Sequence, residues 1–372
     1  MGYSEGIIYL SDLIDMSSVV IEKTAFGTLP SNEAVWCYTL SHPQGGKVSI
    51  LTFGAALQSW QVDEQTDIVL GYDNLAAYQQ NPHYLGVIVG RYANRIAKGQ
   101  FSLNDIHYQV PQNQGGNCLH GGEQGFSHRN WQAEIIEKDG LPSLALKLTS
   151  ENGDQGFPGT LKAEVHYSMP AANQLRIEYR AMSDRDTLFN PTSHGYFNLA
   201  GHHSGNALAQ QVRIAASNVL KIDETGIPLG PLSEVANSVF DLRKPVTLGE
   251  IYSSMPEELS GTRGYDHNWC LDAYAPEQAA CYAGSLMAPA LGTELQVYTD
   301  MPGLQLYTAN FLDNGLKGKD GADYGAYHGV CLESQLYPDS PNQPAYPSAC
   351  LAEGNTFYSR TEYRFITTKA AE

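Results

Sequence analysis

Three segments of the sequence place side chains capable of acid/base chemistry beside glycines and aromatic residues. His194 lies in the run NPTSHGYFNLAG of residues 190–201, His120 precedes two glycines, and Glu333 lies in the run CLESQ of residues 331–335. Imidazole and carboxylate groups have ordinary pKa values of about 6.5 and about 4.3, so modest tuning makes them an acid and a base near neutral pH. These three side chains are the first candidates for proton transfer.

Each candidate also has a structural interpretation when taken alone. His120 before its glycines can be a turn residue, and Glu333 between Leu332 and Leu336 can be a paired carboxylate of a sheet. His194 can equally be a hydrogen-bonded histidine near a strand end. Taken one at a time, the segments leave these alternatives open.

The elements that must position these residues read as β-strands. Apolar and polar residues alternate with period two in residues 144–148, 165–169 and 175–179, which predicts half-buried strands. Turn-forming residues at 138–140 and 171–173 separate successive runs and predict antiparallel hairpins. Further strand-like runs occur at about 35–40, 47–62, 85–92, 101–110, 293–299, 304–311, 329–336 and 362–367.

Helical periodicity is scarce. Only residues 74–80 and 256–259 predict short helices, and neither is long enough to cover a parallel sheet. We therefore expect an all-β fold, a large antiparallel β-sandwich with few short helices. We expect one such domain over residues 18–372, preceded by an N-terminal extension of residues 1–17.

Charge and composition limit the kinds of partner and cofactor that the protein is expected to bind. The formal net charge of −18 disfavours nucleic acid and anionic membranes, which attract basic surfaces. Acidic residues flank the first apolar run, residues 6–10, unlike a basic signal peptide, so we expect a cytoplasmic protein. The six cysteines form no CxxC pair and no HExxH motif occurs, which predicts free thiols and neither a metal nor another cofactor.

Five motifs, taken in their order along the chain, resemble the aldose 1-epimerase (galactose mutarotase) family, and the likeness spans roughly residues 20–368. They are GRYANRI at residues 90–96, LHGG at 119–122, NPTSHGYFNL at 190–199, DHN at 266–268 and LESQ at 332–335. Ser193 and Gly195 depart from the residues common in the family, and we expect differences in specificity there more than in activity.

The resemblance implies a supersandwich fold and the interconversion of the α and β anomers of a free hexose such as galactose or glucose through the open-chain aldehyde. It implies Glu333 as general base on the anomeric hydroxyl, His194 as general acid to the ring oxygen, and His120 as an assisting group. Carried over in the same way, Asn94, Arg95 and Asp266 would hold sugar hydroxyls. Gln335 would share the strand face of Glu333 if that strand is regular, and so is a further substrate-binding candidate.

Other interpretations stay open at this stage. The substrate could be a hexose 6-phosphate, with Arg91, Arg95 and Lys98 reaching the phosphate. The same fold could serve as a sugar-binding module without catalysis. Glu333 and Asp266 could instead be the two carboxylates of a glycoside hydrolase, whose separation a sequence does not give. For the aldose 1-epimerase interpretation we expect a small-molecule monosaccharide substrate and a monomer or homodimer.

Overall fold

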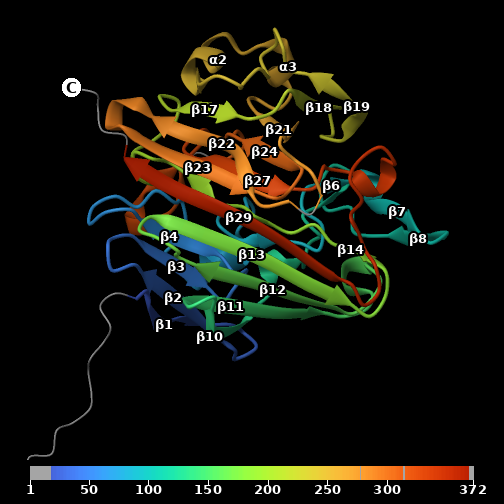
Figure 1. The fold of residues 1–372 in the computed structure, drawn as a ribbon, viewed down its shortest axis with the longest axis horizontal. Helices are drawn as coiled ribbons and strands as arrows, with labels where there is room; N and C mark the ends of the chain where they lie inside the picture. The colour runs from blue at the N-terminus through green and yellow to red at the C-terminus, as the bar shows by residue number, and fades with distance from the viewer. Residues whose placement is uncertain (1–17, 277, 313–314, 368–372) are drawn as a thin grey trace, which may run out of the picture.

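Antiparallel sheets form the body of the molecule, as a computed structural model shows for residues 18–276, 278–312 and 315–367 (Figure 1). This confirms the expected all-β class. The largest sheet has the strand order β10 (Gln132–Lys138), β11 (Leu141–Ser150), β12 (Leu161–Ser168), β13 (Gln174–Ser183), β29 (Thr356–Thr367), β23 (Thr293–Thr299), β22 (Cys281–Ala288), β17 (Gln211–Ile214) and β20 (Val246–Thr247).

A second sheet carries the residues of greatest chemical interest. Its strand order is β16 (Tyr196–Phe197), β27 (Val330–Gln335), β24 (Gly303–Tyr307), β21 (Asp266–Cys270), β18 (Asn218–Ile222) and β19 (Pro228–Glu234). A third sheet, at the start of the described chain, has the order β1 (Val20–Thr28), β2 (Ala34–Ser41), β3 (Lys47–Leu51) and β4 (Leu57–Gln61).

Short elements complete the fold. The two-stranded pairs are β5 (Ile88–Val89) with β15 (Thr192–Ser193), β6 (Arg95–Ile96) with β9 (Cys118–Leu119), β7 (Gln100–Leu103) with β8 (Ile106–Gln109), β14 (Thr187–Leu188) with β28 (Cys350–Leu351), and β25 (Leu316–Lys317) with β26 (Asp323–Tyr324). The α-helices are α1 (Leu75–Gln80), α2 (Leu248–Ser254) and α3 (Glu257–Ser260). No helix of the described ranges is long and apolar enough to cross a membrane.

The six-stranded sheet has one apolar face and one polar face. On β27, Val330 and Leu332 join the main core together with Trp269 and Leu304 of neighbouring strands. That core also includes side chains of the nine-stranded sheet, for example Ile177. Because successive side chains of a strand point to opposite faces, the residues between the apolar ones lie on the other face. Because the apolar face of the six-stranded sheet packs into the core of the sandwich, the opposite face is the one that can carry polar side chains.

The structure confirms some of the turns, strands and helices predicted from the sequence and corrects others. The hairpin turns at 138–140 and 171–173 are confirmed by the β10–β11 and β12–β13 pairs, and α1 begins where expected, with the Asn74 side chain accepting from the Ala77 N–H. The predicted strand 47–62 is two strands, broken around Gly54, whose φ is +67°. The predicted strand 85–92 contains only β5, and α2 lies outside the predicted helices.

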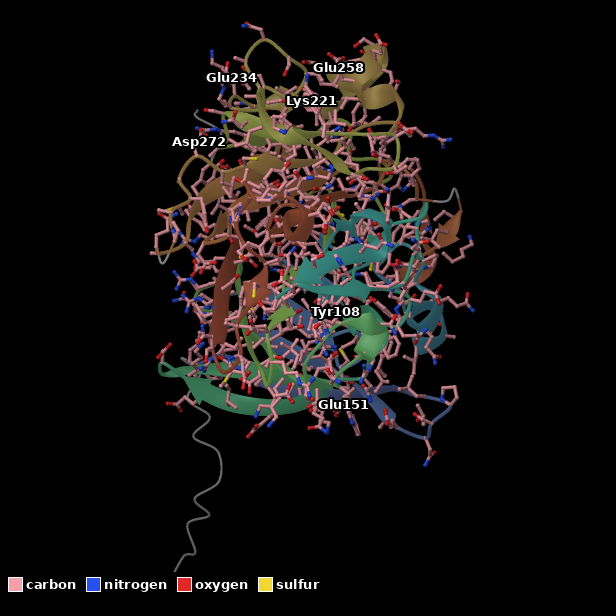
Figure 2. The ribbon with its side chains drawn as sticks, turned by 90° about the vertical axis from the view of Figure 1, so that its right-hand side faces the viewer. Tyr108, Glu151, Lys221, Glu234, Glu258 and Asp272 are labelled. Carbon is pink, nitrogen blue, oxygen red and sulfur yellow. The ribbon has the colours of Figure 1, made fainter. Side chains whose placement is uncertain are left out.

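The remaining sequence predictions concern the surface, the thiols and the N-terminus. Figure 2 shows acidic side chains such as Glu151, Glu234, Glu258 and Asp272 at the periphery, and all four are exposed, as the net charge of −18 suggests. All six cysteines lie in the described part of the chain and are unpaired, three of them buried. The predicted extension, residues 1–17, lies outside the described residues, so the domain boundary at residue 18 stays a prediction.

Candidate active site

A cavity of about 190 Å³ opens on the polar face of the six-stranded sheet. This volume suits a small molecule and not a macromolecule. Its lining is polar and aromatic, with side chains from distant parts of the sequence: Pro82, His83, Tyr84, Asn94, Arg95, Gln114, Leu119, His120, His194, Tyr196, Asp266, Gln305, Tyr307, Phe311 and Glu333. The cavity therefore brings together six of the seven residues singled out from the sequence.

Glu333 lies at the base of this cavity, on β27. Its side chain is only 2% exposed, and its cross-strand neighbour on β24 is Gln305. Burial and, secondarily, the negative charge of Asp266 raise the pKa of Glu333 well above its usual value, while Arg95 opposes this shift. Once ionised, a carboxylate of raised pKa is a stronger base than an exposed one.

His194 faces Glu333 across the cavity. Strand β15 ends at Ser193, and backbone hydrogen bonds from His194 to Val87 and from Gly86 back to His194 fix the position of the histidine. Its Nε2 lies 3.8 Å from Glu333 Oε1. Burial lowers the pKa of His194 to about 4, so the protonated imidazole is a strong acid.

Aromatic rings pack against the His194 imidazole and restrict its orientation. The ring stacks between Tyr84 and Tyr196, with centroid separations of 6.1 Å and 5.1 Å and interplanar angles of 22° and 21°. His120 meets it edge-on at 5.2 Å. The Nε2 atom of the ring faces Glu333, whereas Nδ1 lies 3.7 Å from Cys331 Sγ, within hydrogen-bonding distance for sulfur.

His120 is held in a defined tautomer. The Asn94 backbone N–H donates to His120 Nδ1 at 3.1 Å, so the ring hydrogen of the neutral form is on Nε2. Burial, then the proximity of His194 and Arg95, lowers the pKa of His120 well below its usual value. Neutral His120 can therefore donate a hydrogen bond from Nε2.

The turn that presents His120 depends on glycine. His120 itself has φ +51°, and Gly121 follows with φ +84°. A Cβ at Gly121 would lie 2.0 Å from the Gly90 carbonyl oxygen, so no other residue fits there without moving the backbone. The glycine after His120 in the LHGG motif thus allows the close backbone contact that places His120 at the cavity.

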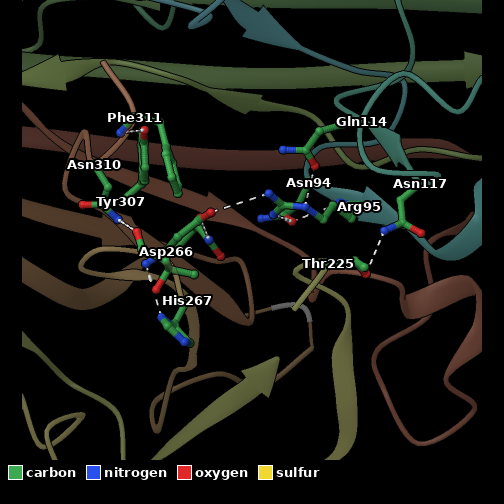
Figure 3. Close-up of polar contacts among 12 residues, drawn as sticks. Asn94, Arg95, Gln114, Asn117, Thr225, Asp266, His267, Tyr307, Asn310 and Phe311 are labelled. Atoms are coloured by element: carbon green, nitrogen blue, oxygen red, sulfur yellow. Dashed lines mark hydrogen bonds and ion pairs between the residues drawn. The ribbon is translucent and has the colours of Figure 1, made fainter. Parts of the chain in front are cut away.

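A network of polar side chains also contributes to the lining of the cavity (Figure 3). Arg95 donates from Nε to Gln114 at 2.9 Å, and its Nη2 lies 3.5 Å from Asp266 Oδ2. The Asn94 side-chain oxygen accepts from the Arg95 N–H at 3.0 Å, and Gln305 donates to Asp266 Oδ1 at 2.7 Å. These fixed donors and acceptors are of the kind that recognises sugar hydroxyls.

The Arg95 guanidinium rests directly on a glycine of a distant hairpin. Gly226 has φ +83°, and a Cβ there would lie 2.7 Å from Arg95 Nε and 2.8 Å from Cζ. In the same loop, the Thr225 hydroxyl accepts from the Asn117 side chain at 3.0 Å (Figure 3). No motif in the sequence pointed to this loop, because only the fold brings it against Arg95.

Gln335 is the predicted site residue that does not line the cavity. It lies two residues beyond Glu333 on the same face of β27, as expected for a regular strand, but it is completely buried. The sequence did not predict three other residues that line the cavity, namely Gln305, Gln114 and Tyr84. Gln305 is positioned by its pairing opposite Glu333, a relationship between strands that no local pattern reveals.

The geometry bears on two other hypotheses from the sequence, the phosphate ligands and the residues expected to alter specificity. Arg91 does not reach the cavity: it is buried, and its guanidinium donates to Ser150, Glu151, Pro158 and Thr187. Lys98 is exposed and also absent from the lining, so Arg95, already paired with Asp266, is the only Lys or Arg among the described residues that line the cavity. Ser193 and Gly195 flank His194 but do not line the cavity either.

One group of side chains has the composition of a metal site. Ligand atoms of His194, Cys331 and Glu333 lie within 4.8 Å of one another, and all three residues are buried. The His194 Nδ1 to Cys331 Sγ distance is 3.7 Å. Proton transfer between His194 and Glu333 needs no metal, and we assign no metal to the site.

A β-sandwich with an opposed, buried histidine–carboxylate pair in a polar cavity defines a class of enzyme that moves protons on small hydroxylated molecules. The comparisons with known proteins identify the class further. The aldose 1-epimerase family model matches residues 37–364. The chain belongs to the aldose 1-epimerase family, and its activity is that of an isomerase of this family.

Individual relatives agree over nearly the whole chain. Galactose mutarotase of Mus musculus is 40% identical over 352 residues, which cover 93% of this chain and 99% of the mouse protein. Aldose 1-epimerase of Escherichia coli is 34% identical over 91% of this chain and 97% of its own length. The crystal structure of a galactose 1-epimerase from Lactobacillus acidophilus superposes with a TM-score of 0.83, at 27% identity, over 94% of this chain and all of that one.

Proposed function

We propose that the protein interconverts the α and β anomers of a free hexose, with galactose and glucose as the first candidates, and that Glu333 and His194 are the catalytic acid/base pair. The observation that carries this proposal is the opposition of Glu333 Oε1 and His194 Nε2 at 3.8 Å in a polar cavity of small-molecule size. Several of the relatives are galactose mutarotases, which supports galactose as a substrate.

The proposed reaction is a balanced double proton transfer. Ionised Glu333 takes the proton of the C1 hydroxyl, the C1–O5 bond breaks, and its electron pair goes to O5, which receives a proton from protonated His194. The aldehyde that forms at C1 rotates about C1–C2 and presents its other face. The ring then closes with the roles of Glu333 and His194 reversed, which returns both groups to their starting state.

The burial of the pair favours this direction of transfer. Burial raises the pKa of Glu333 and lowers the pKa of His194, so both shifts favour the uncharged forms. The uncharged pair is what ring opening produces. Proton transfer from sugar to Glu333 and from His194 to O5 is therefore driven by the low polarity around the two groups, in addition to the chemistry of the sugar.

The other cavity residues have supporting roles in this proposal. His120 donates from Nε2 near the ring oxygen, while Asn94, Arg95 and Asp266 hold sugar hydroxyls. The substrate is a monosaccharide without a phosphate, because Arg95 is the only Lys or Arg that the described part of the chain contributes to the cavity, and Asp266 neutralises it. A cytoplasmic location, and a monomer or homodimer, complete the proposal.

Polarimetry tests both activity and substrate. Freshly dissolved α-D-galactose, glucose, arabinose and glucose 6-phosphate should each be followed with and without the protein. We expect the free hexoses to equilibrate fastest. Faster turnover of glucose 6-phosphate would overturn the choice of substrate. Galactose binding in calorimetry without any rate enhancement would instead favour a sugar-binding module.

A further inference from the structure

The polar face that carries Glu333 also carries a layer of buried amide side chains, one of which, Gln305, lines the cavity. Gln305 on β24 pairs opposite Glu333, and Asn268 on β21 pairs opposite Gln305. Gln335 follows on the same face of β27. The exposed fractions are 1% for Asn268, 3% for Gln305 and 0% for Gln335. These three residues are called the amide layer below.

Most polar atoms of the amide layer have no hydrogen-bond partner among the described residues. The buried atoms without one are Asn268 Oδ1 and Nδ2, Gln305 Oε1, Gln335 Oε1 and Nε2, and the inner carboxylate oxygen Oε2 of Glu333. Only the Gln305 Nε2 donates, to Asp266. Buried polar atoms are nearly always hydrogen-bonded in proteins, so this concentration beside one carboxylate calls for a partner.

Gly303 makes room for the layer. It pairs opposite Gln335, and a Cβ at this position would lie 2.6 Å from Asn268 Oδ1 and 3.1 Å from the Gln335 carbonyl oxygen. The Asn268 amide therefore occupies the space above Gly303, next to Gln335. The next neighbours on the same face, Leu220 and Cys270, are buried and offer the amides little.

Internal water is the partner that fits this chemistry. Buried water molecules typically make about three hydrogen bonds to polar groups that are otherwise unsatisfied. We propose that the amide layer binds internal water against Glu333 Oε2, and that Asn268 and Gln335 are positioning residues for the catalytic carboxylate. The amide oxygens accept from the water and orient it, so that the water donates to Oε2.

In this arrangement the two carboxylate oxygens of Glu333 have different roles in catalysis. A hydrogen bond to Oε2 stabilises the ionised carboxylate that the reaction requires, and so opposes the effect of burial on this group. Oε1 keeps its orientation toward His194 and the sugar. This inference rests on the proposed role of Glu333 as general base, and it assigns Gln335 to positioning and not to direct sugar binding.

The test is Gln335→Met, which keeps an unbranched side chain of similar size and removes the amide. The matched control is Ser334→Ala: Ser334 is on the same strand, is 2% exposed and has an Oγ without a partner, but it points to the opposite face. We expect Gln335→Met to lower kcat about tenfold with KM within about twofold, and to move the acid limb of the kcat/KM profile up by roughly one pH unit. Ser334→Ala should match the parent in all three.

A measurement without turnover separates this inference from the function itself. In protein labelled with ¹³C at the glutamate carboxyl carbon, the Glu333 signal is the one lost in Glu333→Gln. Its pKa should be higher in Gln335→Met than in the parent and in Ser334→Ala. An unchanged Glu333 pKa in Gln335→Met would overturn the positioning role, whatever the activity. An inactive parent would count against the proposed function alone.

A crystal structure of the parent protein at a resolution that shows ordered water covers the case in which Gln335→Met fails to fold. We expect at least one internal water bonded to Glu333 Oε2 and to Asn268 or Gln335. Amides bonded directly to each other or to Oε2, with no water between them, would overturn the proposal.

Discussion

His194 Nε2 and Glu333 Oε1 face each other at 3.8 Å although the two residues are 139 positions apart in the chain. The side chains are 6% and 2% exposed, so water screens their interaction only weakly. A proton that leaves one group therefore changes the energy of the proton on the other. The pair acts as one unit in the predictions that follow.

Removing either member of the pair should remove most of the activity. We expect Glu333→Gln and His194→Ala each to lower kcat by about 10²–10⁴-fold, the contribution of a positioned acid or base. The double variant should lose little more than the worse single variant, because the two groups act in the same step. Polarimetry with galactose checks this. Equilibration at the parent rate by Glu333→Gln would rule out Glu333 as the base.

The raised pKa of Glu333 also has a consequence for stability. Because the folded protein holds the Glu333 proton more tightly than the unfolded chain, its stabilising effect is complete below the unfolded pKa and is lost as pH rises through the folded pKa. Glu333→Gln is free of this loss. We expect its Tm, measured against the parent, to rise progressively as pH increases above the ordinary carboxyl pKa of about 4.3. The exposed Glu137 on β10 supplies the control, since Glu137→Gln should show no such trend.

Gly226→Ala tests the contact between the distant hairpin and Arg95. The new methyl would lie 2.7 Å from Arg95 Nε, so the guanidinium must shift, which disturbs its contacts with Asp266 and Gln114. We expect kcat/KM to fall roughly tenfold, mainly through a higher KM.

Gly230→Ala is the matched control for this variant. Gly230 lies on β19 of the same hairpin and has φ +102°, so an alanine there is strained too, but its Cβ would meet only Gln343, at 3.7 Å. Its kcat/KM should equal that of the parent. Equal losses in both variants would show that hairpin strain, and not Arg95, controls the effect.

Arg91→Lys tests the structural assignment of the buried arginine. Arg91 makes five side-chain hydrogen bonds, and lysine has three donors on one atom, so several buried acceptors would lose their partner. We expect the free energy of unfolding in urea to fall by about 2–4 kcal/mol. The ratio of rates on galactose and glucose 6-phosphate should not change. A selective change in the phosphate rate would restore Arg91 as a phosphate ligand, and exposed Lys98→Ala should alter neither property.

The sequence by itself determined the all-β class, two of the hairpins and the short helix after Asn74. These follow from local patterns, because the alternation of apolar residues sets the faces of a strand and turn residues set its ends. The family motifs added His194, Glu333 and their partners, since motif order survives without knowledge of the fold.

Only the tertiary structure decided how the remaining groups meet. Gln305 lies beside Glu333 because β24 pairs with β27 in one register, and Gly226 lies on Arg95 because a hairpin 131 residues further along folds over it. Arg91 and Arg95 are four residues apart, yet the Arg91 guanidinium donates to buried carbonyl and hydroxyl groups away from the cavity, whereas Arg95 lines the cavity. Strand register and the direction of a long side chain depend on the whole packed core, and local sequence does not specify either.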